Sequence, residues 1–280
     1  MKLLFSVVLF LAVSATHAQE PFKGITYAGY RSGQSPYTGI SPSPTEVQED
    51  MTLVRSIAPR VRTYSARERV NVPEVAAASG LEVFAGAWVS DDRESTEQEL
   101  AAVVAQAKLP AVTHVIVGNE ALLRKDVSVG RMALLLEQTR GRTDKPVSTA
   151  EPWGVWLAHP ELAKHVDFIA AHILPYWEDV PDTKAVEYAM ERLTILQEAF
   201  PGKRIVITET GWPSDGEKRG RSIASPEAQR NYLTQFAAAA RARNIDYFII
   251  EGFDQPWKHV LEGKVGSHWG VFDANRRLKL

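Results

Sequence analysis

The strongest constraint on the fold is an alternation that runs along the chain. Short runs rich in β-branched residues alternate with longer segments in which apolar residues recur every three or four positions. The expected strands comprise residues 24–27, 60–64, 81–87, 113–118, 146–149, 166–172, 204–208 and 247–252. The expected helices comprise residues 44–57, 70–79, 94–107, 129–139, 183–200 and 226–243. This alternation, over about 250 residues, is typical of a single (β/α)8 TIM barrel in the α/β class.

The first residues have a different pattern from the rest. Met1 and Lys2 precede an apolar run over residues 3–13, which small residues follow up to Ala18. This order is typical of a secretory signal peptide, and the run is shorter than the roughly 20 residues that span a bilayer. A buried first strand is the alternative. We expect a signal peptide over residues 1–18, cleaved near Ala18, and one catalytic barrel domain over residues 19–280. The mature protein would be exported, to a periplasm or outside the cell, without a membrane anchor.

Several common functional motifs are absent. A doubly wound open sheet is the alternative fold, and it often carries a Gly-rich phosphate loop. No two glycines are separated by a single residue, so the dinucleotide fingerprint is missing, and the chain has no Gly-x-x-x-x-Gly-Lys loop. The His-Glu-x-x-His and Gly-x-Ser-x-Gly motifs are also missing. We therefore expect no nucleotide cofactor, zinc protease chemistry or serine hydrolase chemistry.

Composition excludes further classes. The 280 residues include 32 Lys and Arg against 34 Asp and Glu, so the chain lacks the positive excess that nucleic-acid binding needs. There is no Cys, which removes disulfides, thiolate metal sites and cysteine nucleophiles. Carboxylates remain as the catalytic candidates. We expect a monomer that needs no cofactor and no catalytic metal.

Two expected strands end in a glutamate. Residues 113–118 lead into Asn119 and Glu120, and residues 204–208 lead into Glu209. In a (β/α)8 barrel, catalytic residues stand at the C-terminal ends of strands, and these are the fourth and seventh. Their side chains can therefore face each other across the mouth, as glycoside hydrolysis requires of its two carboxyl groups. For either glutamate alone, an ordinary ion pair with Lys or Arg is the alternative.

These segments resemble a known family. Val-Gly-Asn-Glu at 117–120 and Ile-Thr-Glu-Thr-Gly-Trp-Pro-Ser at 207–214 resemble the two signatures of glycoside hydrolase family 17. The family contains β-1,3-glucanases, lichenases and β-1,3-glucan glucanosyltransferases, all retaining (β/α)8 enzymes. The resemblance covers nearly all of the mature chain, and its further matches are residues 24–27, 62–64, 173–176, 253–258 and 268–272. Residues 33–36 and 148–153 resemble the bacterial branch, in which the domain is often fused to a membrane glycosyltransferase.

The resemblance implies specific roles. Glu120 would be the general acid/base and Glu209 the nucleophile, about 5–5.5 Å apart as in retaining enzymes. Repulsion from Glu209 would raise the pKa of Glu120 and keep it protonated at the start. By the same resemblance, Asn119 would hydrogen-bond the 2-hydroxyl of the reacting sugar and Tyr176 would orient Glu209.

Aromatic residues cluster near the expected strand ends. The apolar C–H faces of sugars stack on aromatic rings, so these residues are candidates for substrate binding. The candidates are Trp88, Trp153, Trp177, Trp212, Trp257, Tyr27, Tyr30 and Tyr64. Trp257 has the strongest case for lying under the reacting sugar, since the wider clan carries a tryptophan after strand eight.

Nearby polar residues leave two alternatives open. Arg62 would brace Glu209 or the substrate, or form a structural salt bridge. Glu151, together with Glu251, Asp254 and Lys258, would bind sugar hydroxyls or pair within the protein. His172 fits a buried barrel histidine better than a catalyst.

Three functions fit these features. The first is a retaining hydrolase of β-1,3-glucan, and the second is a glucanosyltransferase that uses the same two glutamates. The third is a non-catalytic carbohydrate-binding barrel, which the presence of both glutamates disfavours.

Overall fold

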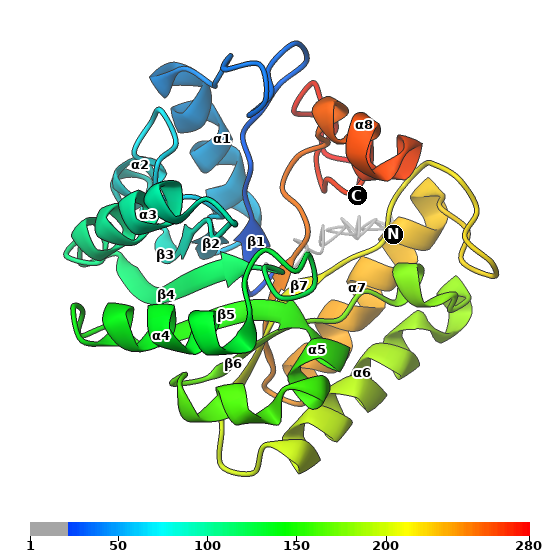
Figure 1. Cartoon of the computed structure of the whole chain (residues 1–280). Helices are drawn as coiled ribbons and strands as arrows, with labels where there is room; N and C mark the ends of the chain where they lie inside the picture. The colour runs from blue at the N-terminus through cyan, green and yellow to red at the C-terminus, as the bar shows by residue number, and fades with distance from the viewer. Residues whose placement is uncertain (1–21) are drawn as a thin grey trace, which may run out of the picture.

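The computed structural model describes residues 22–280, so the expected signal peptide lies outside the described residues. Eight parallel strands close into a barrel in the order β1 to β8, and helices surround it (Figure 1). The ring closes where Ile25 of β1 pairs with Ile249 of β8. The (β/α)8 barrel predicted from the sequence is confirmed.

The strands follow the predicted order, with small changes at their ends. They are β1 (Ile25–Thr26), β2 (Arg60–Arg62), β3 (Glu82–Ala87), β4 (Val112–Asn119), β5 (Val147–Pro152), β6 (Ile169–His172), β7 (Ile205–Thr210) and β8 (Asp246–Ile249). The α-helices are α1 (Pro44–Ile57), α2 (Val72–Ala78), α3 (Arg93–Gln106), α4 (Val129–Arg140), α5 (Trp153–Ala158), α6 (Asp182–Ala199), α7 (Pro226–Ala242) and α8 (His259–Glu262). Short 3₁₀ helices are η1 (Pro160–Lys164), η2 (Pro175–Glu178), η3 (Pro256–Lys258) and η4 (Lys264–Ser267).

Helix α1 begins and ends at the predicted residues. Its start is defined by Ser43, whose side chain accepts a hydrogen bond from the amide of Glu46, while the Glu46 carboxylate accepts one from the amide of Ser43. This reciprocal capping box, with Pro44 at the first helical position, satisfies donors that the helix leaves unpaired. Such local signals explain why this boundary was predictable.

Two segments differ from the predicted pattern. Helix α5 lies between β5 and β6, where the sequence pattern predicted no helix, and α8 after β8 has only four residues. Neither has a side-chain cap, and both are too short to show a helical period. They lie at the C-terminal side of the barrel, next to the strand ends that carry the candidate site.

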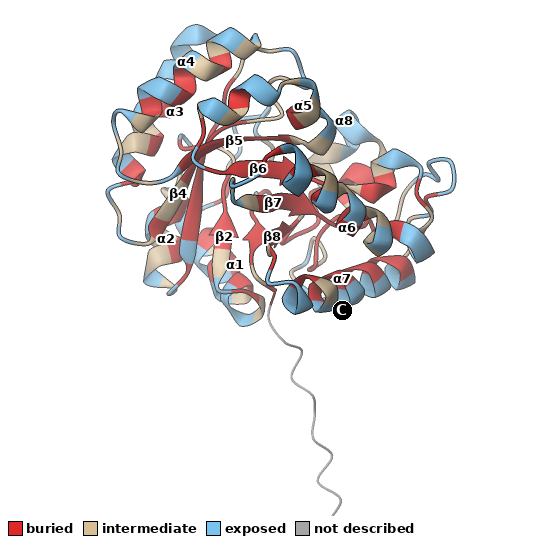
Figure 2. Ribbon diagram, turned by 90° about the horizontal axis from the view of Figure 1, so that it is seen from below, coloured by how far each residue is buried: buried red, intermediate tan, exposed pale blue. Residues whose placement is uncertain are grey.

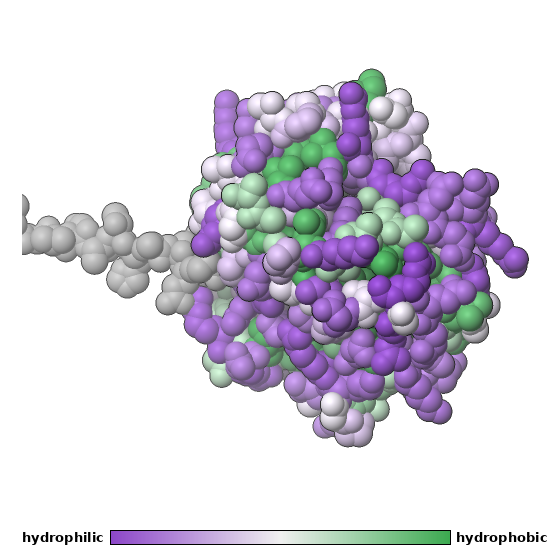
Figure 3. Space-filling model, turned by 90° about the vertical axis from the view of Figure 1, so that its left-hand side faces the viewer, coloured by the Kyte–Doolittle hydropathy of each residue, from purple (hydrophilic) through white to green (hydrophobic). Residues whose placement is uncertain are grey.

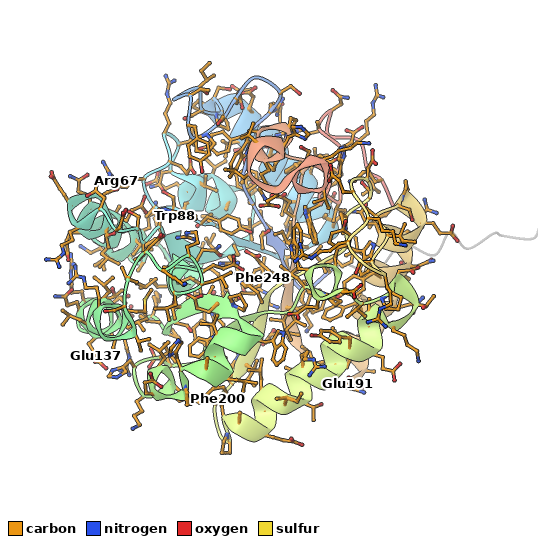
Figure 4. The ribbon with its side chains drawn as sticks, turned by 45° about the vertical axis from the view of Figure 1, so that its right-hand side comes forward. Arg67, Trp88, Glu137, Glu191, Phe200 and Phe248 are labelled. Carbon is orange, nitrogen blue, oxygen red and sulfur yellow. The ribbon has the colours of Figure 1, made fainter. Side chains whose placement is uncertain are left out.

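The barrel interior is packed with apolar side chains. They are Phe84, Ile116, Ala150, Phe168, Ala170, Val206 and Phe248. Phe248 lies near the middle of the ring of strands (Figure 4), and the buried strands form the centre of the molecule in Figure 2. The barrel is therefore a filled core, and its open end is the mouth at the C-terminal ends of the strands.

Strand alternation determines which polar residues face the mouth. Side chains two positions apart along a strand share a face. His172 follows interior Ala170 by two positions, so it points inward at the end of β6. On β2, Arg60 packs over the ring of Phe248, so Arg62 also points inward.

The outer faces of the helices are polar. In Figure 2 their outward sides are exposed while their inward sides are buried, and the face shown in Figure 3 is mostly hydrophilic with small separate apolar patches. Within residues 22–280, no helix has the length and hydropathy of a membrane span.

Candidate active site

The ends of β4, β6 and β7 bring three ionisable side chains together at the mouth. One carboxylate oxygen of Glu120, one of Glu209 and one ring nitrogen of His172 lie within 4.8 Å of one another. Retaining glycosidases hold their two carboxyl groups about 5–5.5 Å apart, whereas inverting enzymes need about 6.5–9.5 Å to admit a water molecule. The spacing therefore fits the retaining geometry.

A sharp turn in the backbone presents Glu120. Gly118 has φ +83°, and a Cβ there would lie 3.0 Å from Cε of Met132. Glu120 itself has φ +55°, a left-handed conformation that costs a residue with a side chain roughly 1 kcal/mol. Its amide donates to the carbonyl of Ala150 on β5 at 2.7 Å. The turn lifts the carboxylate out of the strand and leaves its side chain 25% exposed.

Arg62 contacts side chains at the ends of β4 and β7, the two strands that lead to the glutamates. Its buried guanidinium donates from Nη1 to Oε1 of Glu209 at 2.9 Å and from Nη2 to Oδ1 of Asn119 at 2.5 Å. Of the alternatives for Arg62, the structure therefore has the ion pair with Glu209. Because Oδ1 of Asn119 accepts from Arg62, its amide NH2 is the group left to contact a ligand.

Tyr64 supplies a second donor to Glu209. Its hydroxyl donates to the same Oε1 at 2.9 Å, and the Arg62 guanidinium lies 4.9 Å from the centre of its ring. Two donors on one oxygen leave Oε2 as the less engaged oxygen of Glu209.

His172, interpreted from the sequence as a buried barrel histidine, also contacts both glutamates of the site. Its Nδ1 lies 2.7 Å from Oε1 of Glu120 and 3.5 Å from Oε2 of Glu209. The ring is 1% exposed, so these contacts replace water. The available signal was its position at a strand end, two residues after an interior alanine.

The protonation of Glu120 differs from the expectation. Burial raises its pKa, but the hydrogen bond and charge of His172, together with the positive charges of Arg124 and Arg62, outweigh burial and lower the pKa below its ordinary value. Repulsion from Glu209, which we expected to dominate and raise this pKa, does not. In the unliganded protein, Glu120 therefore favours its ionised form.

Two carboxylates and an imidazole could in principle hold a divalent ion. Each of the three already accepts or donates a hydrogen bond within the protein, and the Arg62 guanidinium lies against Glu209. Because a fixed positive charge opposes a second cation, this set of residues fits acid–base chemistry better than a metal centre.

The expected role of Tyr176 was wrong. Its hydroxyl donates to the backbone carbonyl of Glu217, and its ring packs edge-on against Trp177 and Trp212. Tyr176 lies in η2, beyond the end of β6, where strand alternation no longer determines direction. Tyr64 makes the contact with Glu209 that we expected of Tyr176.

Two expected substrate-binding aromatics are instead part of the core. Trp212 is 0% exposed and donates from its indole nitrogen to the carbonyl of Ile223. Tyr27 is buried and its hydroxyl donates to Asp50 on α1. Proximity to a strand end placed both near the mouth, but it does not indicate on which side of the strand a ring lies.

Glu151 does not face the substrate side either. It is 0% exposed, and its two oxygens accept from the amides of Leu122 and Leu123 at 2.8 and 3.3 Å. Burial raises the pKa of Glu151 to about 7 despite these bonds. Through these bonds Glu151 fixes the backbone of the loop that follows Glu120, and so helps to position Glu120.

The other polar candidates pair within the protein. Lys258 donates to Oε1 of Glu251 at 2.8 Å, and burial raises the pKa of Glu251 to about 7 even beside this lysine. Asp254 accepts from Lys279 at 2.8 Å and from the amide of Gly270. These contacts fit the pairing alternative for all three residues.

Four tryptophans retain accessible surface near the mouth. Trp257 is half-buried, with Tyr30 and Tyr37 edge-on at 5.9 Å each. Trp88 is 38% exposed, and the Arg124 guanidinium lies 4.3 Å from the centre of its ring. Two more are half-buried beside an arginine: Trp153 at 4.8 Å from Arg192 and Trp177 at 5.1 Å from Arg219.

Comparison with known proteins agrees with this geometry. Residues 24–270 match the family described as the BtgE/BtgC glycoside hydrolase domain. The chain belongs to this family. A glucan 1,3-β-glucosidase of Saccharomyces cerevisiae is 25% identical over 268 residues, which cover 86% of each chain.

Solved structures extend the agreement to the fold. The family 17 β-1,3-glucanosyltransferase from Rhizomucor miehei is 27% identical with a TM-score of 0.80, covering 92% of this chain and 95% of that one. An active-site mutant of that enzyme in complex with laminaritriose is 26% identical with a TM-score of 0.81. It covers the same shares of the two chains. The resemblance to glycoside hydrolase family 17 is thereby confirmed.

Proposed function

We propose that this glycosidase-family barrel is a retaining enzyme acting on β-1,3-glucan through a covalent glycosyl-enzyme intermediate. The observation that carries the proposal is the pair of carboxylates, Glu120 and Glu209, within 4.8 Å at the barrel mouth. The substrate class is supported by the names of the relatives, a glucan 1,3-β-glucosidase and a β-1,3-glucanosyltransferase.

The two glutamates have different parts in the mechanism. Oε2 of Glu209 attacks the anomeric carbon, while Glu120 gives its proton to the glycosidic oxygen and the bond to the leaving sugar breaks. Arg62 and Tyr64 hold Glu209 through Oε1 as it attacks. Glu120, now ionised, then takes a proton from the hydroxyl that attacks the anomeric carbon, which releases Glu209.

The acceptor in the second step separates two activities. Water gives hydrolysis, the first candidate, and a sugar hydroxyl gives transfer. Transfer is supported by the likeness to the R. miehei glucanosyltransferase over 92% of this chain. The half-buried Trp153 and Trp177 are candidates for binding a sugar acceptor, because both keep part of their ring surface accessible.

Incubation of the protein with a laminari-oligosaccharide of defined length tests this function. We expect shorter products in which the newly formed reducing end first appears as the β-anomer. Longer or branched products would instead assign transfer by the same intermediate. An unchanged oligosaccharide that still binds would contradict catalysis and leave a carbohydrate-binding barrel.

Tyr64→Phe should lower kcat on laminari-oligosaccharides by about 10- to 100-fold, because it removes one hydrogen bond to a charged group. Tyr176→Phe is the matched control, since that hydroxyl bonds to Glu217 and not to Glu209. Steady-state kinetics of the two variants check the assignment. An equal loss in both variants would mean that Tyr64 has no special part in holding Glu209.

We further propose that the mature protein is exported, with residues 1–18 removed. The support is the order of a positive start, an apolar run and small residues before Ala18.

A further inference from the structure

We propose that His172 is a positioning residue for Glu120, whose Nδ1–H holds the acid/base carboxylate in the free enzyme and sets the upper pH limit of its action. The inference deepens the proposed function and rests on the roles given there to Glu120 and Glu209. It starts from contacts of His172 that the proposed mechanism does not use.

Arg62 determines which nitrogen of His172 carries the proton. Nη1 of Arg62 lies 3.4 Å from Nε2 of His172. A guanidinium can only donate hydrogen bonds, so Nε2 must be the acceptor and the proton of the neutral ring must be on Nδ1. That N–H points at Oε1 of Glu120, 2.7 Å away.

Charged side chains from several strand ends face the ring of His172. Arg62 faces it from β2, Glu120 from the turn after β4 and Glu209 from β7. Glu151 on β5 also interacts with it electrostatically. The ring is buried, so Nδ1–H has the carboxylate of Glu120 as its hydrogen-bond partner at 2.7 Å, with Oε2 of Glu209 farther away at 3.5 Å.

The hydrogen bond from Nδ1–H of His172 to Glu120 disfavours one of the two chemical steps and favours the other. A hydrogen bond to an ionised carboxylate favours the ionised form. It therefore works against the first step, in which Glu120 must hold a proton, and favours the second, in which Glu120 must accept one. The hydrogen bond from His172 is one of the causes that lower the pKa of Glu120, beside the charges around it, which agrees with this direction.

Two substitutions of His172 test whether the enzyme needs its N–H donor or only the volume of its ring. His172→Phe removes the N–H, and His172→Asn retains a side-chain N–H near the position of Nδ1. In His172→Phe the carboxylate loses a bond to its charged form, so the alkaline limb of kcat/KM on laminari-oligosaccharides should move to higher pH by about one unit. In His172→Asn the limb should stay near that of the wild type.

Tyr176→Phe is the control, since this buried tyrosine touches neither glutamate and should leave the limb in place. A folded His172→Phe enzyme with an unmoved alkaline limb would overturn the proposal. A wild type without activity on any glucan would count against the proposed function and not against this hydrogen bond.

A measurement on the wild type needs neither turnover nor a variant. The ¹⁵N chemical shifts of the His172 ring distinguish the protonated from the unprotonated nitrogen. We expect the proton on Nδ1 across the pH range in which the ring is neutral. A ring protonated on Nε2 would overturn the proposal whatever the activity of the enzyme.

Discussion

Glu209→Gln is expected to reduce turnover of laminari-oligosaccharides by a factor on the order of 10⁴ or more. An amide cannot attack the anomeric carbon, so the covalent intermediate cannot form. The side chain keeps its shape, and its remaining oxygen can still accept from Arg62 and Tyr64, which donate to Oε1 in the native protein. Steady-state rates, with a thermal melt of each variant, test the prediction.

The matched control for this variant is Glu191→Gln. Glu191 is exposed on α6 and lies on the outside of the barrel in Figure 4. It should retain wild-type turnover and the same melting temperature. More than trace activity in a folded Glu209→Gln protein would remove Glu209 from the role of nucleophile.

Glu120→Ala should have the second largest effect, and its size should depend on the leaving group. General acid catalysis contributes about 10²- to 10⁴-fold, and it is needed when the leaving group is a sugar. An aryl glucoside with an acidic phenol leaves without a proton, so formation of the intermediate from it should be nearly unaffected. The ratio of the two losses, from pre-steady-state and steady-state rates, measures the acid role.

Azide separates the two glutamates further. In Glu120→Ala, azide can enter where the carboxylate stood and attack the intermediate, so the product should be a β-glucosyl azide. In Glu209→Ala it would take the place of the nucleophile and give the α-anomer from an activated β-substrate. Equal losses on sugar and aryl leaving groups in Glu120→Ala would contradict its role as the acid.

Much of the fold was predictable because its signals are local. The capping box at Ser43 and the proline at position 44 mark the start of α1 without reference to the rest of the chain. Helix α5 was missed because a segment of six residues without a cap has neither signal. The strand ends that deliver Glu120 and Glu209 were visible as apolar runs that terminate in a carboxylate.

The partners of these glutamates were harder to predict, because each comes from another strand. Tyr64 lies two positions after Arg62, and the alternation of β2 could have indicated that both point inward. The position of Glu209 opposite His172 depends on a register shift between Ala171 and His172, where β6 pairs with β7. A shift of this kind has no signal in the order of residues.

Trp212 shows that sequence position alone does not predict whether an aromatic ring near the mouth is exposed. It follows β7 within two residues of the strand end, as a mouth residue would, yet its indole is fully buried. Trp88, at the end of β3, is 38% exposed. Sequence position places both near the same edge, but the packing of the surrounding loops determines which ring is accessible.

The most direct test of the proposed mechanism is to trap the covalent intermediate in the wild-type enzyme. A 2-deoxy-2-fluoro β-glucoside with a good leaving group slows both steps, but it slows release of the intermediate more than formation, so the sugar accumulates on the nucleophile. After proteolysis, mass spectrometry should find the fluorosugar on the peptide that contains Glu209 and on no peptide that contains Glu120. Label on Glu120, or turnover with inversion and no labelled peptide, would contradict the mechanism.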